Sequence, residues 1–151
     1  MRYESINDRL LDLLNGMAGA EASDLHLVPG HPPMYRIHGV LTAIVAAPIA
    51  PGEALTMVRT VAPTELSARF EEAFDLDFAS QLGDAPQPAL FLVNLFASRS
   101  DKGACFRAIP SHIPTLAELG FPQELGERMI DQKHGLILLT GVTGSGKTTS
   151  L

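Results

Sequence analysis

Residues 90–109 read LFLVNLFASRSDKGACFRAI, and this pattern predicts two antiparallel strands joined by a short loop. Residues 90–96 are apolar at nearly every position, which is typical of a strand covered on both faces. The polar residues 99–103 end in glycine and return the chain into a second strand over residues 104–109. This hairpin makes an antiparallel sheet the expected framework of the surrounding chain.

The residues before the hairpin extend this sheet and add helices. Alternating or apolar runs bounded by turn residues predict strands over residues 24–28, 34–38, 41–45 and 74–78. Apolar residues at helical spacing predict a first helix that begins near Ile6, with Ser5 as its cap. Further helices are expected over residues 53–62 and 63–72. The predicted fold class of residues 1–110 is α+β, a mainly antiparallel sheet with flanking helices.

Composition limits the classes of protein that fit. Hydrophobic residues make up 46% and charged residues 19% of the chain, which is typical of a folded protein and not of a disordered one. The 17 acidic residues outnumber the 11 basic ones, so a surface that binds nucleic acid through many phosphate contacts is not expected. The single cysteine excludes a disulfide framework. No apolar run is long enough to predict a transmembrane segment.

Beyond residue 110 the sequence predicts a second structural unit. Prolines interrupt residues 111–122, which we interpret as a linker. A helix is predicted over residues 123–131, and residues 136–140 (LILLT) are apolar on both faces, like a central parallel strand of an α/β sheet. Residues 123–151 are therefore expected to begin an α/β domain.

Residues 141–148, GVTGSGKT, match the phosphate-binding pattern G-x-x-x-x-G-K-[ST] at every fixed position. Glycines let successive backbone N–H groups approach phosphate oxygens, Lys147 supplies positive charge to the β- and γ-phosphates, and the Thr148 hydroxyl binds Mg²⁺. ATP and Mg²⁺ are therefore the expected cofactors. The expected nucleotide-binding residues are Gly141, Val142, Thr143, Gly144, Ser145, Gly146, Lys147, Thr148 and Thr149.

Hydrolysis needs more than this loop. A second carboxylate for Mg²⁺ and a group that orients the attacking water are also required, and in such a sheet both lie downstream of the loop. We therefore expect the 151-residue chain by itself to bind nucleotide weakly at best and not to turn it over.

Several short motifs resemble the N-terminal domain of pilus-retraction (twitching-motility, PilT-type) ATPases, a branch of the type II and type IV secretion ATPases. The matching residues keep the order and spacing of that family: Ser23-Asp24-Leu25-His26-Leu27, Gly30, Pro32-Pro33, Arg36, Gly39, Val93-Asn94, Phe106-Arg107, Ile109-Pro110, Leu116, Glu118-Leu119-Gly120 and residues 135–149. The serine-aspartate motif begins at Ser23, whereas the pilus-assembly and type II secretion relatives carry a long extra region before it. This difference favours the retraction type.

The resemblance implies a fold, an assembly and a location. In this family a PAS-like N-terminal domain, here residues 1–110, is joined by a flexible linker, here residues 111–122, to a RecA-like core that would begin within residues 123–151. Six copies form a ring, and ATP lies between the core of one subunit and the N-terminal domain of its neighbour. Movement of these domains pulls pilin subunits out of the fibre base. The family works in the cytoplasm, peripheral to the inner membrane through the pilus or secretion machinery.

The resemblance also implies arginines on the later strands of the N-terminal domain that reach the phosphates of ATP. Arg107 matches one such position, and Arg99 lies one position from a place where the family often has an arginine. Leu90 and Leu92 stand where two further family arginines are typical. The alternative role for Arg107 is a structural salt bridge at the edge of the sheet.

Two other functions remain open on the sequence. A secretion, conjugation or pilus-assembly ATPase shares these motifs, and a regulatory module would instead use the PAS-like domain to bind a small ligand or a partner. His26, His31 and His38 are not expected to form a metal site, because three loops would have to converge. Asp75 and Asp77 are expected on a solvated strand face.

Overall fold

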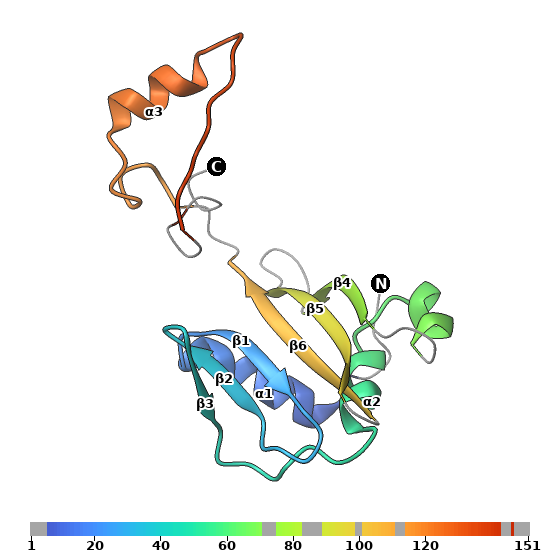
Figure 1. The fold of residues 1–151 in the computed structure, drawn as a ribbon. Coiled ribbons are helices and arrows are strands. Elements are labelled where there is room, and N and C mark those ends of the chain that lie inside the picture. Colours follow the sequence, from blue (N-terminus) through green and yellow to red (C-terminus); the bar gives the residue numbers. More distant parts are fainter. Residues whose placement is uncertain are drawn as a thin grey trace. The chain divides into compact units, whose positions relative to one another are not determined.

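The computed structural model describes residues 6–70, 75–82, 89–98, 101–110, 114–142 and 146. The chain divides into two compact units, Met1–Ser111 (unit 1) and His112–Leu151 (unit 2). Unit 1 holds a β-sheet with its helices, and unit 2 holds a short helix and extended chain (Figure 1).

Unit 1 is built on a 6-stranded sheet whose neighbouring strands all run antiparallel. The strands are β1 (Ala22–Leu27), β2 (Met34–Ile37), β3 (Val40–Ala43), β4 (Asp75–Leu82), β5 (Ala89–Ser98) and β6 (Asp101–Ile109). Their order is β3-β2-β1-β6-β5-β4, so β1 and β6, far apart in the sequence, lie side by side at the centre (Figure 1). The predicted hairpin is confirmed, with Leu90 opposite Ile109 at one end and Ser98 opposite Asp101 at the other. The α+β class is confirmed with it.

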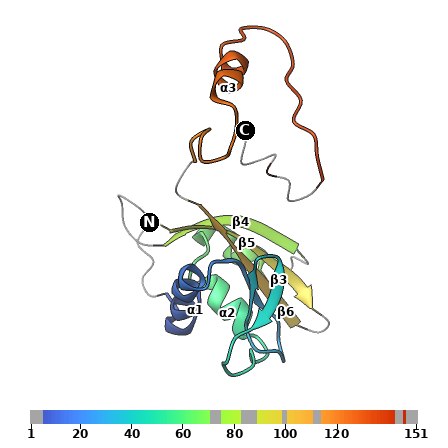
Figure 2. The ribbon, with the colours of Figure 1, turned by 90° about the vertical axis from the view of Figure 1, so that its left-hand side faces the viewer.

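Two α-helices lie on one face of this sheet (Figure 2). α1 (Asp8–Gly19) packs against β1, and α2 (Glu53–Arg59) packs against β6 and β5. An ion pair of 2.6 Å between Arg9 Nη1 and Glu53 Oε1 joins the two helices. The largest fully buried side chains of the core include Leu10, Met17, Leu25, Leu27, Met57, Val93, Leu95 and Phe106. We call the opposite side of the sheet, which no described helix of unit 1 covers, the open face.

The first helix begins later than the sequence predicted. Asn7 is its N-cap, because Asn7 Oδ1 accepts a hydrogen bond of 3.0 Å from the backbone N–H of Leu10. Ser5, the predicted cap, lies outside the described residues. The cap is therefore an asparagine placed one residue before the helix.

A close contact fixes α1 on the sheet. The hydroxyl of Tyr35 on β2 donates a buried hydrogen bond of 2.5 Å to the carbonyl oxygen of Leu13. A Cβ atom at position 16 would lie 2.5 Å from this hydroxyl oxygen, so only glycine fits at Gly16 without a shift of the tyrosine. The glycine thus sets how near the helix comes to β2.

The prediction that the first arm of the hairpin is covered on both faces is wrong. Phe91, Val93 and Leu95 are buried under the helices, whereas Leu90 and Leu92 point to the open face and are 36% and 41% exposed. The reason is the one-sided packing of an antiparallel sheet, which leaves its second face to solvent or to a partner. The alternation predicted for β4 is confirmed, since exposed and buried residues alternate along all of it.

The helices that follow β3 are shorter than predicted. The helix expected over residues 53–62 ends at Arg59, and the one expected over residues 63–72 is a 3₁₀ helix, η1 (Thr64–Arg69). Thr60 Oγ1 donates to the carbonyl oxygen of Met57, which satisfies one of the last carbonyls of α2.

Unit 2 contains α3 (Gln123–Ile130), which confirms the predicted helix to within one residue. The strand predicted over residues 136–140 is not formed, and Leu136, Ile137 and Leu138 are 80%, 48% and 72% exposed. A strand exists only through hydrogen bonds to a neighbouring strand, and the described residues of unit 2 include no such neighbour. The apolar pattern alone therefore does not produce the strand.

Candidate functional site

The register of the sheet places three charged side chains in one row across its open face. Asp24 on β1 pairs with Arg36 on β2 and with Arg107 on β6, and Arg107 in turn pairs with Leu92 on β5. Directly opposed residues in an antiparallel sheet lie within side-chain contact of each other. We call these three residues, Arg36, Asp24 and Arg107, the arginine–aspartate cluster. Strand pairing makes them neighbours, although Asp24 and Arg107 are 83 positions apart in the sequence.

Asp24 lies on the open face because it alternates with Leu25 and Leu27, which are buried under the helices, and a β-bulge comes just before it. The register of β1 shifts between Ala22 and Asp24: Ala22 pairs with Ile37, and Asp24 pairs with Arg36, the next residue along β2. Ser23 is therefore one residue more than β2 can match. The bulge lets Ala22 lie in the core on the same side as Leu25 and Leu27, while Asp24 faces its arginine neighbours.

The carboxylate of Asp24 is almost fully enclosed by its partners, with 2% of the residue exposed. Arg107 Nε donates to Asp24 Oδ1 at 2.8 Å, and Arg36 Nε lies 3.2 Å from Oδ2. The hydroxyl of Ser23 donates to Oδ2 at 2.7 Å. Each oxygen of the carboxylate thus binds one guanidinium, which satisfies a buried charge.

The two arginines differ in how much of the guanidinium is engaged. Arg36 Nη1 donates to the carbonyl oxygen of Gly39 at 3.1 Å, its Nη2 lies 3.4 Å from His26 Nε2, and its side chain is 34% exposed. The side chain of Arg107 is 64% exposed, and its contact with Asp24 is made through Nε. Arg36 is therefore held at both ends of its head group, whereas most of the Arg107 side chain is exposed to solvent.

Charge balance in the cluster favours an anion. Burial acts to raise the pKa of Asp24, but hydrogen bonds from Arg107 and Ser23 and the charge of Arg107 outweigh it, so this pKa lies below its ordinary value. Burial and the charge of Arg36 lower the pKa of His26, which is therefore neutral at pH 7. Two arginines and one carboxylate leave one net positive charge, and Arg107 is its most exposed bearer.

The depressed pKa of Asp24 predicts how stability depends on pH. The ionised carboxylate stabilises the folded state above its unfolded pKa of about 3.9, and this contribution is lost as pH falls through the lower folded value. We expect Asp24→Asn to lower the unfolding free energy of the 151-residue chain by about 1–3 kcal/mol at pH 7. The difference from the parent chain should shrink below about pH 4. Urea unfolding at several pH values measures it, and an equal difference at every pH would contradict the assignment.

The phosphate-binding motif is described only in part. Gly141, Val142 and Gly146 are exposed, and Gly146 has φ +84°, a left-handed conformation that favours glycine. The other predicted nucleotide-binding residues, Thr143, Gly144, Ser145, Lys147, Thr148 and Thr149, lie outside the described residues, as does Arg99. The roles assigned to these residues by the sequence therefore stay predictions.

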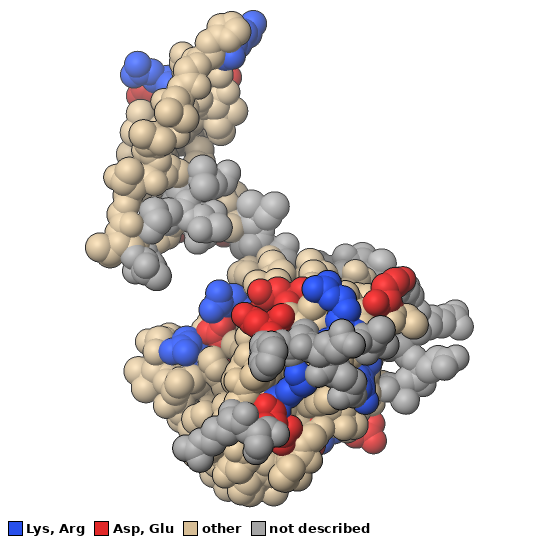
Figure 3. All heavy atoms as spheres, turned by 45° about the vertical axis from the view of Figure 1, so that its right-hand side comes forward, with Lys and Arg blue, Asp and Glu red and all other residues tan. Residues whose placement is uncertain are grey.

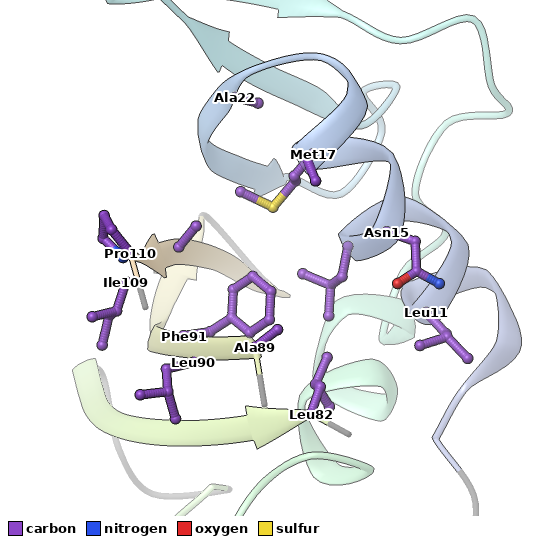
Figure 4. Close-up of a pocket in the computed structure, with 13 residues that line it drawn as sticks. Leu11, Asn15, Met17, Ala22, Leu82, Ala89, Leu90, Phe91, Ile109 and Pro110 are labelled. Atoms are coloured by element: carbon purple, nitrogen blue, oxygen red, sulfur yellow. The ribbon is translucent and has the colours of Figure 1, made fainter. Parts of the chain in front are cut away.

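An apolar pocket of about 450 Å³ lies between α1 and the ends of β4, β5 and β6 (Figure 4). Met17 from α1 and Phe91 from β5 reach into it, and Asn15 is its polar side chain. None of the described residues that line it is charged. A pocket of this composition suits an apolar group and not a phosphate.

The remaining charged groups form no second site in the part of the chain that the structure describes. Asn94 Nδ2 donates to Asp75 Oδ1 at 2.5 Å and to Asp77 Oδ1 at 3.1 Å, so these carboxylates belong to an exposed polar face. Among the described residues, no group of histidine, cysteine and acidic side chains fits a metal ion. Acidic and basic side chains are interspersed on the surface of unit 1 that Figure 3 shows, and neither sign dominates it.

Comparison with known proteins shows which protein family the chain resembles. Residues 103–151 match the family described as type II/IV secretion system protein. The type IV pilus retraction ATPase PilT of Pseudomonas aeruginosa is 38% identical over 142 residues, which cover 94% of this chain and 40% of that protein. The chain belongs to the type II/IV secretion ATPase superfamily.

Other members of the superfamily match over a similar range. The type IV pilus ATPase PilU of the same organism is 32% identical over 139 residues, 92% of this chain and 35% of that protein. The crystal structure of the pilus retraction motor PilT with bound ADP superposes with a TM-score of 0.75 at 33% identity, over 93% of this chain and 40% of that one. The Legionella pneumophila ATPase DotB, at 21% identity and a TM-score of 0.76, shows a common fold.

The chain thus spans about 40% of the length of these secretion ATPases. In the part of the chain that the structure describes, no helix is long and apolar enough to cross a membrane.

The sequence pointed to Arg107 as a candidate site residue but did not indicate its partner Asp24. Asp24 belongs to the serine-aspartate motif, yet no spacing along the chain relates it to Arg107. The signal was the motif itself, a polar serine-aspartate pair near the start of a strand. The strand pairing that gives this pair its meaning is visible only in the folded sheet.

Proposed function

We propose that the chain is the N-terminal part of a ring-forming motor that hydrolyses ATP to drive type IV pilus retraction. The observation that carries the proposal is the 38% identity to PilT along 94% of the chain, together with a complete phosphate-binding motif at residues 141–148. In this proposal six copies form the ring, which acts in the cytoplasm at the inner-membrane platform of the pilus. Residues 1–110 form the PAS-like domain, residues 111–122 the linker, and residues 123–151 the start of the RecA-like core.

The proposed site is shared between two subunits. Residues 141–149 cradle the phosphates of ATP, with Lys147 at the β- and γ-phosphates and Thr148 at Mg²⁺. Arg107 of a neighbouring copy approaches the same phosphates from the open face of its sheet, and Arg99 is a second candidate for this role. The exposure of Arg107, its position on β6 and the net positive charge of its cluster support this assignment.

Replacing Arg107 with alanine in the full-length protein tests the site. We expect kcat for ATP hydrolysis to fall at least about tenfold, because a guanidinium that stabilises charge on the transferred phosphate acts mainly in the transition state. The matched control is Arg69→Ala, which removes an exposed arginine of η1 and should leave kcat within about twofold. An Arg107→Ala ring that hydrolyses ATP at the parent rate would show that the arginine has only a structural role.

Two other functions are separated from this one by simple measurements. Loss of the gene should abolish twitching motility while protein secretion continues, and the reverse result would favour a secretion or assembly ATPase. The 450 Å³ apolar pocket is the observation that supports a ligand-binding module. A thermal shift of the 151-residue chain with small apolar ligands, absent in a pocket-filling variant such as Ala18→Phe, would support that second candidate.

A further inference from the structure

We propose that Asp24 is a positioning residue for Arg107. One carboxylate oxygen of Asp24 contacts Ser23 and Arg36, and the other accepts a hydrogen bond from Arg107 Nε. This bond orients the two Nη groups of Arg107 toward a phosphate group at the open face. The inference rests on the proposed function and assigns to Asp24 a role in the reaction of the neighbouring subunit.

The two oxygens of the Asp24 carboxylate have different partners: Oδ2 contacts Ser23 and Arg36, and Oδ1 contacts Arg107. Oδ2 accepts from Ser23 Oγ at 2.7 Å and lies 3.2 Å from Arg36 Nε, and Arg36 is itself bound to the carbonyl oxygen of Gly39. These contacts fix the orientation of Asp24. Oδ1 then accepts from Arg107 Nε at 2.8 Å.

Attachment through Nε leaves the useful end of the guanidinium available. The two Nη groups form an edge that can bind phosphate in a bidentate way, and the Arg107 side chain is 64% exposed. A freely moving arginine loses side-chain entropy when it binds, whereas one already anchored at Nε loses less. The anchor therefore orders the donor before the phosphate arrives.

To position Arg107, Asp24 needs its negative charge as well as its hydrogen-bonding oxygens. Arg36 and Arg107 flank Asp24 on either side in the same row of the sheet, so without the carboxylate two positive groups would face each other across one strand. Arg36 also contacts Gly39 and His26, whereas Arg107 is held in the cluster through Asp24. Loss of the charge should thus displace Arg107 in particular.

A double-mutant cycle in the full-length ring protein tests this role. We measure kcat and KM for ATP in the parent, Asp24→Asn, Arg107→Ala and the double variant, with ring assembly and Tm recorded for each. Asp24→Asn should lower kcat at least about fivefold with KM nearly unchanged, because the arginine contact is made mainly in the transition state. In the Arg107→Ala background the same change should alter kcat by less than about twofold.

Two further variants keep the test decisive. Ser23→Ala removes one contact to Oδ2 and should give a smaller fall in kcat that also vanishes in the Arg107→Ala background, which serves if Asp24→Asn does not fold. Asp101→Asn is the matched control, because Asp101 accepts hydrogen bonds from the backbone N–H groups of Gly52 and Lys102 and should leave kcat unchanged.

The outcomes separate this inference from the function on which it rests. An Arg107→Ala protein with parent kcat overturns the role of Arg107, and the role of Asp24 with it. A fall in kcat for Arg107→Ala but not for Asp24→Asn overturns the positioning role alone. An equal loss from Asp24→Asn in both backgrounds shows that Asp24 stabilises the fold and does not position the arginine.

Discussion

Replacing Lys147 with alanine in the full-length protein is expected to lower kcat for ATP hydrolysis by about 10²-fold or more. The physical reason is that the phosphate-binding pattern supplies one mobile positive charge at the β- and γ-phosphates, and backbone N–H groups cannot replace a full charge there. Lys147→Arg should also be impaired, because a planar guanidinium does not fit a loop shaped around an ammonium group. Steady-state phosphate release measures the effect.

The control for this prediction lies in the same unit. Lys133 is an exposed lysine before the phosphate-binding motif, and Lys133→Ala removes the same charge without touching the motif. We expect it to keep kcat within about twofold of the parent. Equal activity in the Lys147→Ala and Lys133→Ala proteins would show that the motif has no part in hydrolysis.

Replacing Phe106 with alanine is expected to be among the most destabilising single changes in unit 1. Phe106 is 1% exposed and lies on the central strand β6, opposite Leu25 on β1 and Val93 on β5. Truncation of a buried phenylalanine costs about 3–5 kcal/mol, which is a large part of the 5–15 kcal/mol that holds a typical domain folded. Urea unfolding of the 151-residue chain, followed by circular dichroism, measures the loss.

The matched control for Phe106 is a residue on the other face of the same hairpin. Leu92 is 41% exposed on the open face, so Leu92→Ala should cost less than about 1 kcal/mol in the isolated chain. Similar losses for the two variants would mean that the open face is as well packed as the helix-covered face, which would contradict the one-sided core.

The hairpin shows which parts of the fold local sequence predicts. Residues 90–109 specify their own pairing, because a short polar loop between two apolar runs leaves few alternatives, and the observed register runs from Leu90 opposite Ile109 to Ser98 opposite Asp101. The apolar pattern of residues 90–96 gave a wrong prediction of their burial. Leu90 and Leu92 complete an apolar run that resembles a strand buried on both faces, yet the helices cover only one side.

The second unit shows the opposite case. Residues 136–140 carry as strong a strand pattern as any in the chain, and they form no strand. A strand is stabilised by hydrogen bonds to a neighbouring strand. An apolar pattern therefore favours a strand but forms one only where a second strand pairs with it. The helix α3 forms as predicted, because a helix makes its hydrogen bonds within itself.

By itself, the sequence determined the sheet-forming hairpin, the phosphate-binding motif and the membership of a superfamily, because each depends on residues close together along the chain. It also singled out Arg107. Only the tertiary structure decided what that arginine contacts, since strand pairing brings β1 beside β6 and places Asp24 opposite Arg107. The arginine–aspartate cluster exists because residues distant in the sequence share one row of the sheet. A pattern of neighbouring residues cannot predict a contact between residues 83 positions apart.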